Sequence, residues 1–189
     1  MTKDLQKKVI LSLGIFLFLF LSSCGGLKRE QIQRQMDHAT RQAQMELEAG
    51  KFQRAIDICK EIYPKYPQDP TVRSGYIKTL ESIKSSGDRA FERSDFALAG
   101  CVYEILLKNF SSVSHLNGSF SFNREGLTEK IRNCKKILFE NGLEQYRSGN
   151  LNQAISLWKS ILAFDPENQE IKKVVDMATL QFKNLQKAK

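Results

Sequence analysis

The sequence has very little histidine, and this scarcity limits the chemistry that the chain is able to do. Its only two histidines, His38 and His115, each lack a second histidine or a carboxylate at the spacing of metal ligands. No Ser-His-Asp or Cys-His arrangement has supporting context, and the glycines form no phosphate-binding run. We therefore expect no metal site and no cofactor, and the sequence does not predict an enzyme.

The apolar segment near the start of the sequence is too short to cross a membrane as a helix. The apolar segment Val9–Leu21 has 13 residues, whereas a spanning helix needs about 20. Basic residues precede this segment and small residues follow it, up to a cysteine: Lys3, Lys7, Lys8, Ser22, Ser23 and Cys24. Such an order is typical of a secretory signal peptide. An uncleaved membrane anchor is the weaker alternative.

The stretch Leu21-Ser22-Ser23-Cys24 resembles the lipobox of bacterial lipoproteins, with an aliphatic residue, two small residues and then cysteine. The resemblance implies a signal peptide over residues 1–23, cleavage before Cys24 and covalent lipid on its thiol. Residues 24–30 would then form an acylated tether. Gly25 resembles the residue found in lipoproteins sorted to the outer membrane. We expect a protein of the bacterial cell envelope, held by acyl chains and facing the periplasm.

The net charge limits the classes of binding partner, and the cysteine content limits the possible disulfide bonds. Lys and Arg number 29 against 21 Asp and Glu, which gives a net charge of +8. A basic surface suits anionic lipid headgroups or acidic envelope polymers, although an ordinary solvated surface also fits. Export would exclude nucleic acid as a partner. An oxidising compartment permits one disulfide among Cys59, Cys101 and Cys134, and the sequence leaves the pairing open.

Three stretches repeat one helical pattern when Phe52, Phe96 and Leu151 are aligned. Alanine recurs three residues later, at Ala55, Ala99 and Ala154, and Cys59, Tyr103 and Trp158 recur seven residues later. Nine residues earlier stand Ala43, Gly87 and Gly142. Each unit is predicted to be a long helix, a tight turn and a shorter helix. A small residue lets antiparallel helices cross closely, and we expect the large residue to fill the gap between units.

This pattern resembles the tetratricopeptide repeat (TPR), which carries small residues at its eighth and twentieth places and proline near its thirty-second. Pro67 and Pro166 match the proline, and Ser111 stands there in the middle unit. The resemblance implies an all-α fold of antiparallel helix-turn-helix repeats in a domain over residues 31–187. We expect about three TPR-like units with long first helices, at about 31–67, 70–111 and 124–165, and a capping helix over 166–187. Asp69-Pro70 and Asp165-Pro166 each read as a helix start.

Three groups of residues are candidate partner contacts. Phe120 and Phe122 lie in a Ser-, Asn- and Gly-rich insertion at 112–122 that has no helical period, and they either dock on a partner or fold back. Phe139 and Leu143 widen the apolar stripe of the third long helix, for the capping helix or for a partner groove. Basic residues cluster on the same helix, as a binding patch or a solvated face: Arg124, Lys130, Arg132, Lys135 and Lys136.

These observations favour a membrane-anchored periplasmic scaffold or adaptor that binds another envelope protein through its repeat surface. The resemblance is to repeat-containing lipoproteins that serve outer-membrane protein assembly or act as pilotins for pilus and secretion pores. The alternative is an envelope lipoprotein that binds peptidoglycan or anionic lipid through the basic helix face.

Overall fold

A computed structural model describes residue 30, residues 32–113, residue 116 and residues 119–188. The candidate lipid site Cys24 and its neighbour Gly25 lie outside the described residues. The fold is all-α, as predicted, and no strand occurs within the described part.

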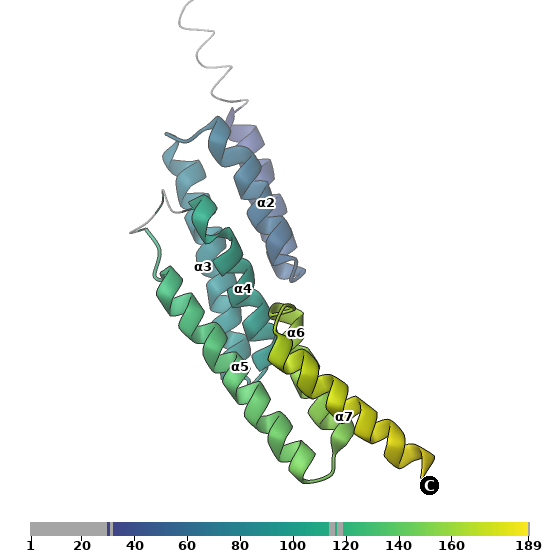
Figure 1. Cartoon of the computed structure of the whole chain (residues 1–189). Coiled ribbons are helices and arrows are strands. Elements are labelled where there is room, and N and C mark those ends of the chain that lie inside the picture. The colour runs from purple at the N-terminus through teal and green to yellow at the C-terminus, as the bar shows by residue number, and fades with distance from the viewer. Residues whose placement is uncertain (1–29, 31, 114–115, 117–118, 189) are drawn as a thin grey trace, which may run out of the picture.

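The helices form an array of antiparallel pairs in which each helix packs on the next along the chain (Figure 1). The first helix covers residues 32–48. The elements after it are α2 (Phe52–Ile62), the 3₁₀ turn η1 (Tyr63–Lys65), α3 (Pro70–Glu92), α4 (Phe96–Val113), α5 (Arg124–Arg147), α6 (Leu151–Phe164) and α7 (Gln169–Lys187). The first helix and α2 lie at one end of the array, and α7 closes the other end.

Each of the three tight turns inside a pair has the same backbone geometry. Gly50, Ser94 and Gly149 stand at equivalent positions with φ of 71°, 62° and 80°. At each turn the following amide donates to a carbonyl five residues back, as Lys51 N does to Glu46 O at 2.8 Å. This is the Schellman motif, which favours glycine because a positive φ crowds a Cβ. The three predicted tight turns are therefore confirmed, and the middle one places a serine at the position of positive φ.

Close helix crossings depend on glycines that face aromatic rings. A Cβ built on Gly87 of α3 would lie 2.7 Å from Tyr103 Cε1 of α4. A Cβ on Gly142 of α5 would lie 2.2 Å from Trp158 Nε1 of α6. Both aromatic residues are fully buried. In each pair, the glycine of the long helix thus contacts the aromatic ring of the shorter helix that follows it.

These pairs correct one expectation. We expected the large residues seven positions after the turn to fill the gap between units, but Tyr103 and Trp158 fill the crossing inside their own unit. The close approach between units is made instead by Gly100 of α4, where a Cβ would lie 2.6 Å from Phe164 Cε1 of α6.

Helix α4 is the centre of the core. By length and composition it is long and apolar enough to cross a membrane, with a mean hydropathy of 1.2. In the fold it contacts α3, α5 and α6, and it buries eight residues. That environment explains its composition, because a helix apolar on several sides is expected where it is covered on several sides.

The two predicted helix starts have different outcomes. Asp69 caps α3 by accepting from the amides of Thr71 and Val72, with Pro70 in the first turn, as expected. The expected start at Asp165 is wrong, because α7 begins at Gln169 and Asn168 is its cap. The Asp165 carboxylate instead accepts from Lys135 Nζ and from Asn168 Nδ2, each at 2.9 Å. These bonds keep residues 165–168 as a turn.

The insertion is shorter than the sequence indicated. Helix α4 continues through Val113, and both Val113 and Leu116 are buried in the core. The residues that we expected to have no helical period at 112–113 are therefore helical. Apolar burial at these two positions outweighs the poor helix propensity of neighbouring serines.

Candidate functional site

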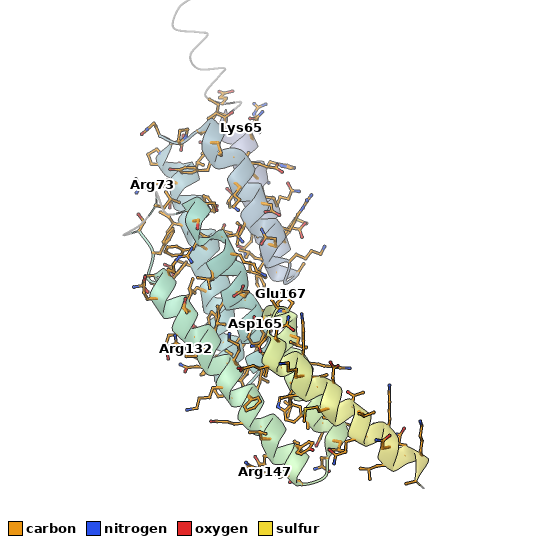
Figure 2. The ribbon with its side chains drawn as sticks, viewed as in Figure 1. Lys65, Arg73, Arg132, Arg147, Asp165 and Glu167 are labelled. Carbon is orange, nitrogen blue, oxygen red and sulfur yellow. The ribbon has the colours of Figure 1, made fainter. Side chains whose placement is uncertain are left out.

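The basic residues predicted on α5 are paired with carboxylates of their own chain. Lys135 Nζ lies 2.9 Å from Asp165 Oδ2, and Lys136 Nζ lies 4.0 Å from Glu140 Oε1. Arg132 pairs with Glu129. Figure 2 labels Arg132 on α5 and Asp165 near the end of α6. The carboxylates reduce the positive potential that this helix face would present to an anionic ligand.

Two further basic residues of α5 lie at its N-terminal half. Arg124 lies over the ring of Phe110, 5.6 Å from its centroid, and donates to Ser111 Oγ at 3.1 Å. Lys130 Nζ lies 2.9 Å from Asp88 Oδ1 of α3. Both contacts tie α5 to the preceding unit, so these two cations support the fold.

Asp88 is a junction of α3, α4 and α5. Its carboxylate accepts from Lys84 Nζ at 2.9 Å, from Tyr103 Oη at 2.7 Å and from Lys130 Nζ at 2.9 Å. Burial would raise the pKa of this carboxyl, but the three hydrogen bonds outweigh burial and lower the pKa to about 2. The group is therefore ionised at neutral pH and holds three helices together.

Phe120 and Phe122 fold back on the domain. Their rings stack with centroids 5.2 Å apart, and both pack half-buried against the main core. Ser121 Oγ donates to Glu81 Oε2 of α3 at 2.6 Å, and Arg73 Nη2 donates to Ser119 Oγ at 3.2 Å. Residues 119–122 are therefore held on α3.

Phe139 and Leu143 lie half-buried beside α6. The ring of Phe139 lies 6.3 Å from that of Trp158, and its carbonyl accepts from Trp158 Nε1 at 3.2 Å. Farther along α5, Tyr146 Oη donates to Gln181 Oε1 of α7. The side of α5 that carries these predicted residues therefore reaches α7 through Tyr146.

The largest concentration of exposed apolar side chains was missed by the sequence interpretation. Within the described residues, six large apolar side chains are exposed, and four belong to α5 or α7. They are Tyr146, Met177, Leu180 and Leu185, at 37%, 71%, 61% and 53% exposure. The sequence interpretation treated α7 as a cover, with Ile171, Val174, Val175, Ala178, Phe182 and Leu185 on its packed face. For Leu185 this was wrong, because its side chain is 53% exposed. Met177 and Leu180 lie outside that packed stripe. Their positions in the sequence could therefore have indicated that their side chains are exposed.

Open hollows of the surface are lined by both polar and apolar side chains. One, of about 420 Å³, lies beside the predicted contacts and is lined partly by Phe120, Phe122 and Lys130. Two others lie at the end of the molecule that holds the first helix. One, of about 520 Å³, lies between the first helix and α3 and is lined partly by Ser82, Ser85 and Arg89. Another, of about 460 Å³, lies between the first helix and α2 and includes His38, Arg54 and Glu61. Across the described ranges, no group of three or more His, Cys, Asp or Glu side chains is placed to hold a metal ion.

The three cysteines of the helical domain are free thiols. Burial is the main cause that raises the pKa of Cys59, Cys101 and Cys134, the last to about 11. A raised pKa keeps the reactive thiolate scarce at neutral pH. These thiols therefore act as small apolar groups in the packing.

No protein-family model, no curated protein and no solved structure matches this chain.

Proposed function

We propose that this protein is a lipid-anchored adaptor of the bacterial cell envelope, which binds another envelope protein through its helical surface. The observation that carries the proposal is the motif Leu21-Ser22-Ser23-Cys24, which ends six residues before residue 30, the first described residue. A thiol in that position is suited to covalent lipid. Two or more acyl chains hold a protein stably on a bilayer, whereas one gives only marginal binding.

The helical array supports a binding role. Paired helices offer a broad surface made of many side chains, which suits contact with another protein. In two of the pairs, a buried glycine–aromatic crossing brings the helices close together and supports this surface. The TPR-like pattern and the localisation to the outer membrane, facing the periplasm, belong to the same proposal.

The alternative ligand, peptidoglycan or anionic lipid on the basic side of α5, has weaker support. Lys135 and Arg132 each have a carboxylate of the same chain at hydrogen-bond distance, and Lys136 has one within ion-pair distance. An anionic ligand would have to displace those carboxylates, and little binding energy would remain.

Fractionation of cells tests the anchor. We expect the full-length protein to remain with membranes after washing with high salt, and the Cys24→Ser variant to become soluble. Cys101→Ser is the matched control, because it removes a half-buried thiol of α4 and leaves Cys24 in place. Membrane retention of Cys24→Ser after the salt wash would refute lipid anchoring.

In-cell crosslinking tests the adaptor role. We expect one envelope protein to be recovered with the wild-type chain in near-equal amount and to be lost with Cys24→Ser. Recovery of only lipid or peptidoglycan fragments would instead establish the alternative ligand.

A further inference from the structure

Helix α7 carries a second stripe of side chains on the side that faces away from α6. Ile171, Val175 and Ala178 are buried and form the packed side of this helix. Nine residues, or two and a half turns, separate Ile171 from Leu180, so their side chains point in opposite directions. Met177 and Leu180 are the two most exposed apolar side chains of α7, at 71% and 61%.

The outer stripe has the spacing of a helix–helix seam. Lys173, Met177, Leu180, Asn184 and Lys187 follow one another at alternating steps of four and three residues, and all five are exposed. Alternation of four and three keeps side chains on one line of a helix and is the spacing at which two helices pack side by side. The stripe has apolar residues near its centre and a lysine at each end. We call these five residues the outer stripe of α7.

Among the described residues, no carboxylate forms an ion pair with the two lysines of the outer stripe. On α5 the cations Lys130, Arg132, Lys135 and Lys136 all pair with carboxylates of this chain. On α7, by contrast, the ion pairs among described residues include Lys172 with Glu167 and leave Lys173, Lys183 and Lys187 without a carboxylate. The helix contains four lysines against two acidic residues, Glu170 and the exposed Asp176, and neither forms an ion pair with Lys173, Lys183 or Lys187. A partner that supplies carboxylates could therefore form ion pairs with these lysines.

We propose that the outer stripe of α7 docks an acidic amphipathic helix of the protein that this adaptor binds, with Tyr146 of α5 at the edge of the contact. The proposal rests on the adaptor function. The complementary helix has apolar residues opposite Met177 and Leu180 and carboxylates opposite Lys173 and Lys187. The stripe extends over about 20 Å at 1.5 Å per residue, so a partner helix of about four turns covers it.

Charge argues against a second copy of this chain on the same stripe. An antiparallel pair of α7 helices places Lys173 opposite Lys187 at both ends, and a parallel pair places each lysine opposite itself. Like charges across a helix seam disfavour the pairing. The same pattern attracts a helix that carries glutamate or aspartate at these places.

A synthetic helical peptide is the probe for this contact. The peptide carries leucines at the two central seam positions and glutamates at the two end positions. One matched peptide replaces those glutamates with lysine, and another keeps them and replaces the leucines with serine. Anisotropy of the labelled peptides is measured against the purified full-length protein in detergent at physiological salt. We expect the acidic amphipathic peptide to bind at least tenfold more tightly than either matched peptide.

Variants of exposed residues assign the binding to the stripe. We expect Met177→Ser with Leu180→Ser to weaken binding of the acidic peptide at least tenfold. Lys173→Glu with Lys187→Glu should reverse the preference, so that the lysine peptide binds more tightly. Met45→Ser is the matched control, because Met45 is 68% exposed on the first helix. Circular dichroism checks that each variant keeps its helices.

Several results would overturn the proposal. They are no binding of the acidic peptide, equal binding of all three peptides, or binding that the serine variant leaves unchanged. A purified protein that dimerises, and becomes monomeric on Met177→Ser with Leu180→Ser, would show that a second copy occupies the stripe. An envelope protein crosslinked in cells at wild-type yield by the serine variant refutes this docking face alone. No crosslinked protein with either chain refutes the adaptor function itself.

Discussion

Gly142 of α5 lies directly against the indole of Trp158 of α6, so close that a Cβ at Gly142 would come within 2.2 Å of Nε1. The Trp158 side chain is only 1% exposed and donates to the Phe139 carbonyl. The ring is therefore fixed by packing and by a hydrogen bond, and it has no free space to move into.

This contact predicts that Gly142→Ala destabilises the fold. Inserting a methyl group into a packed crossing costs about 1–3 kcal/mol, which exceeds the gain of about 1 kcal/mol from the better helix propensity of alanine. Urea unfolding followed by circular dichroism measures the change. Gly75→Ala in α3 is the matched control, because its Cβ would meet only Thr40 Oγ1 at 3.9 Å, and there we expect stabilisation. Equal effects of the two substitutions would contradict the packing argument.

The middle turn predicts a stabilising substitution. Ser94 has a φ of 62°, where the equivalent residues of the other turns are Gly50 and Gly149. A side chain in the left-handed region costs about 1–2 kcal/mol, so we expect Ser94→Gly to raise the free energy of unfolding by about 1 kcal/mol. Ser148→Gly is the control, because Ser148 has a φ of −79° and glycine there only adds freedom to the unfolded chain. Differential scanning calorimetry should show opposite shifts in Tm.

The Asp88 junction predicts a loss of stability in acid. The pKa of Asp88 is lowered to about 2 in the fold, from an ordinary value of 3.8. The ionised form is thus favoured by folding, and its contribution is present above about pH 4 and is lost as the pH falls toward 2. Urea midpoints measured between pH 2 and pH 6 should fall more steeply for the wild type than for Asp88→Asn. Identical slopes would show that the three hydrogen bonds are not maintained in solution.

The hydrogen bonds of Glu81 predict how well residues 119–122 are protected from hydrogen exchange. Glu81→Ala removes the acceptor of Ser121 and leaves only Arg73 among the polar contacts that hold Ser119 and Ser121 on α3. We expect faster hydrogen exchange at these residues, with little change in the helices. Glu104→Ala is a suitable control, because Glu104 pairs within α4 with Lys108 and does not touch the segment. Unchanged exchange in Glu81→Ala would mean that the stacked phenylalanines alone hold it.

Much of the fold was predictable from local rules. The turns at Gly50 and Gly149 and the long helices before them follow from helical spacing and from the chemistry of a helix end. The small residues Gly87 and Gly142 were also expected at helix crossings. Such features depend on residues close together in sequence, where spacing alone places side chains on one face.

The errors come from contacts between distant residues. The sequence does not show that Lys135 reaches Asp165, 30 residues away, and this bond helps to move the start of α7 to Gln169. Likewise, the contact of Gly100 with Phe164 depends on how two units sit together, which spacing along the sequence does not show. The basic cluster on α5 was visible, but the carboxylates opposite Lys130 and Lys135 belong to other elements. The outer stripe of α7 can be recognised from its spacing in the sequence, but the packed stripe of the same helix is more apolar and dominated the interpretation.

The first helix and α7 lie at opposite ends of the array (Figure 1). Under the proposed function, the acyl anchor at Cys24 precedes the first helix in the sequence, and the outer stripe of α7 belongs to the opposite end of the array. Confinement to a surface raises the local concentration of a binding face for any partner on the same membrane, as a short linker does for two joined modules. A contact that is weak between free molecules is then sufficient, and its reach is set by the length of the helical array.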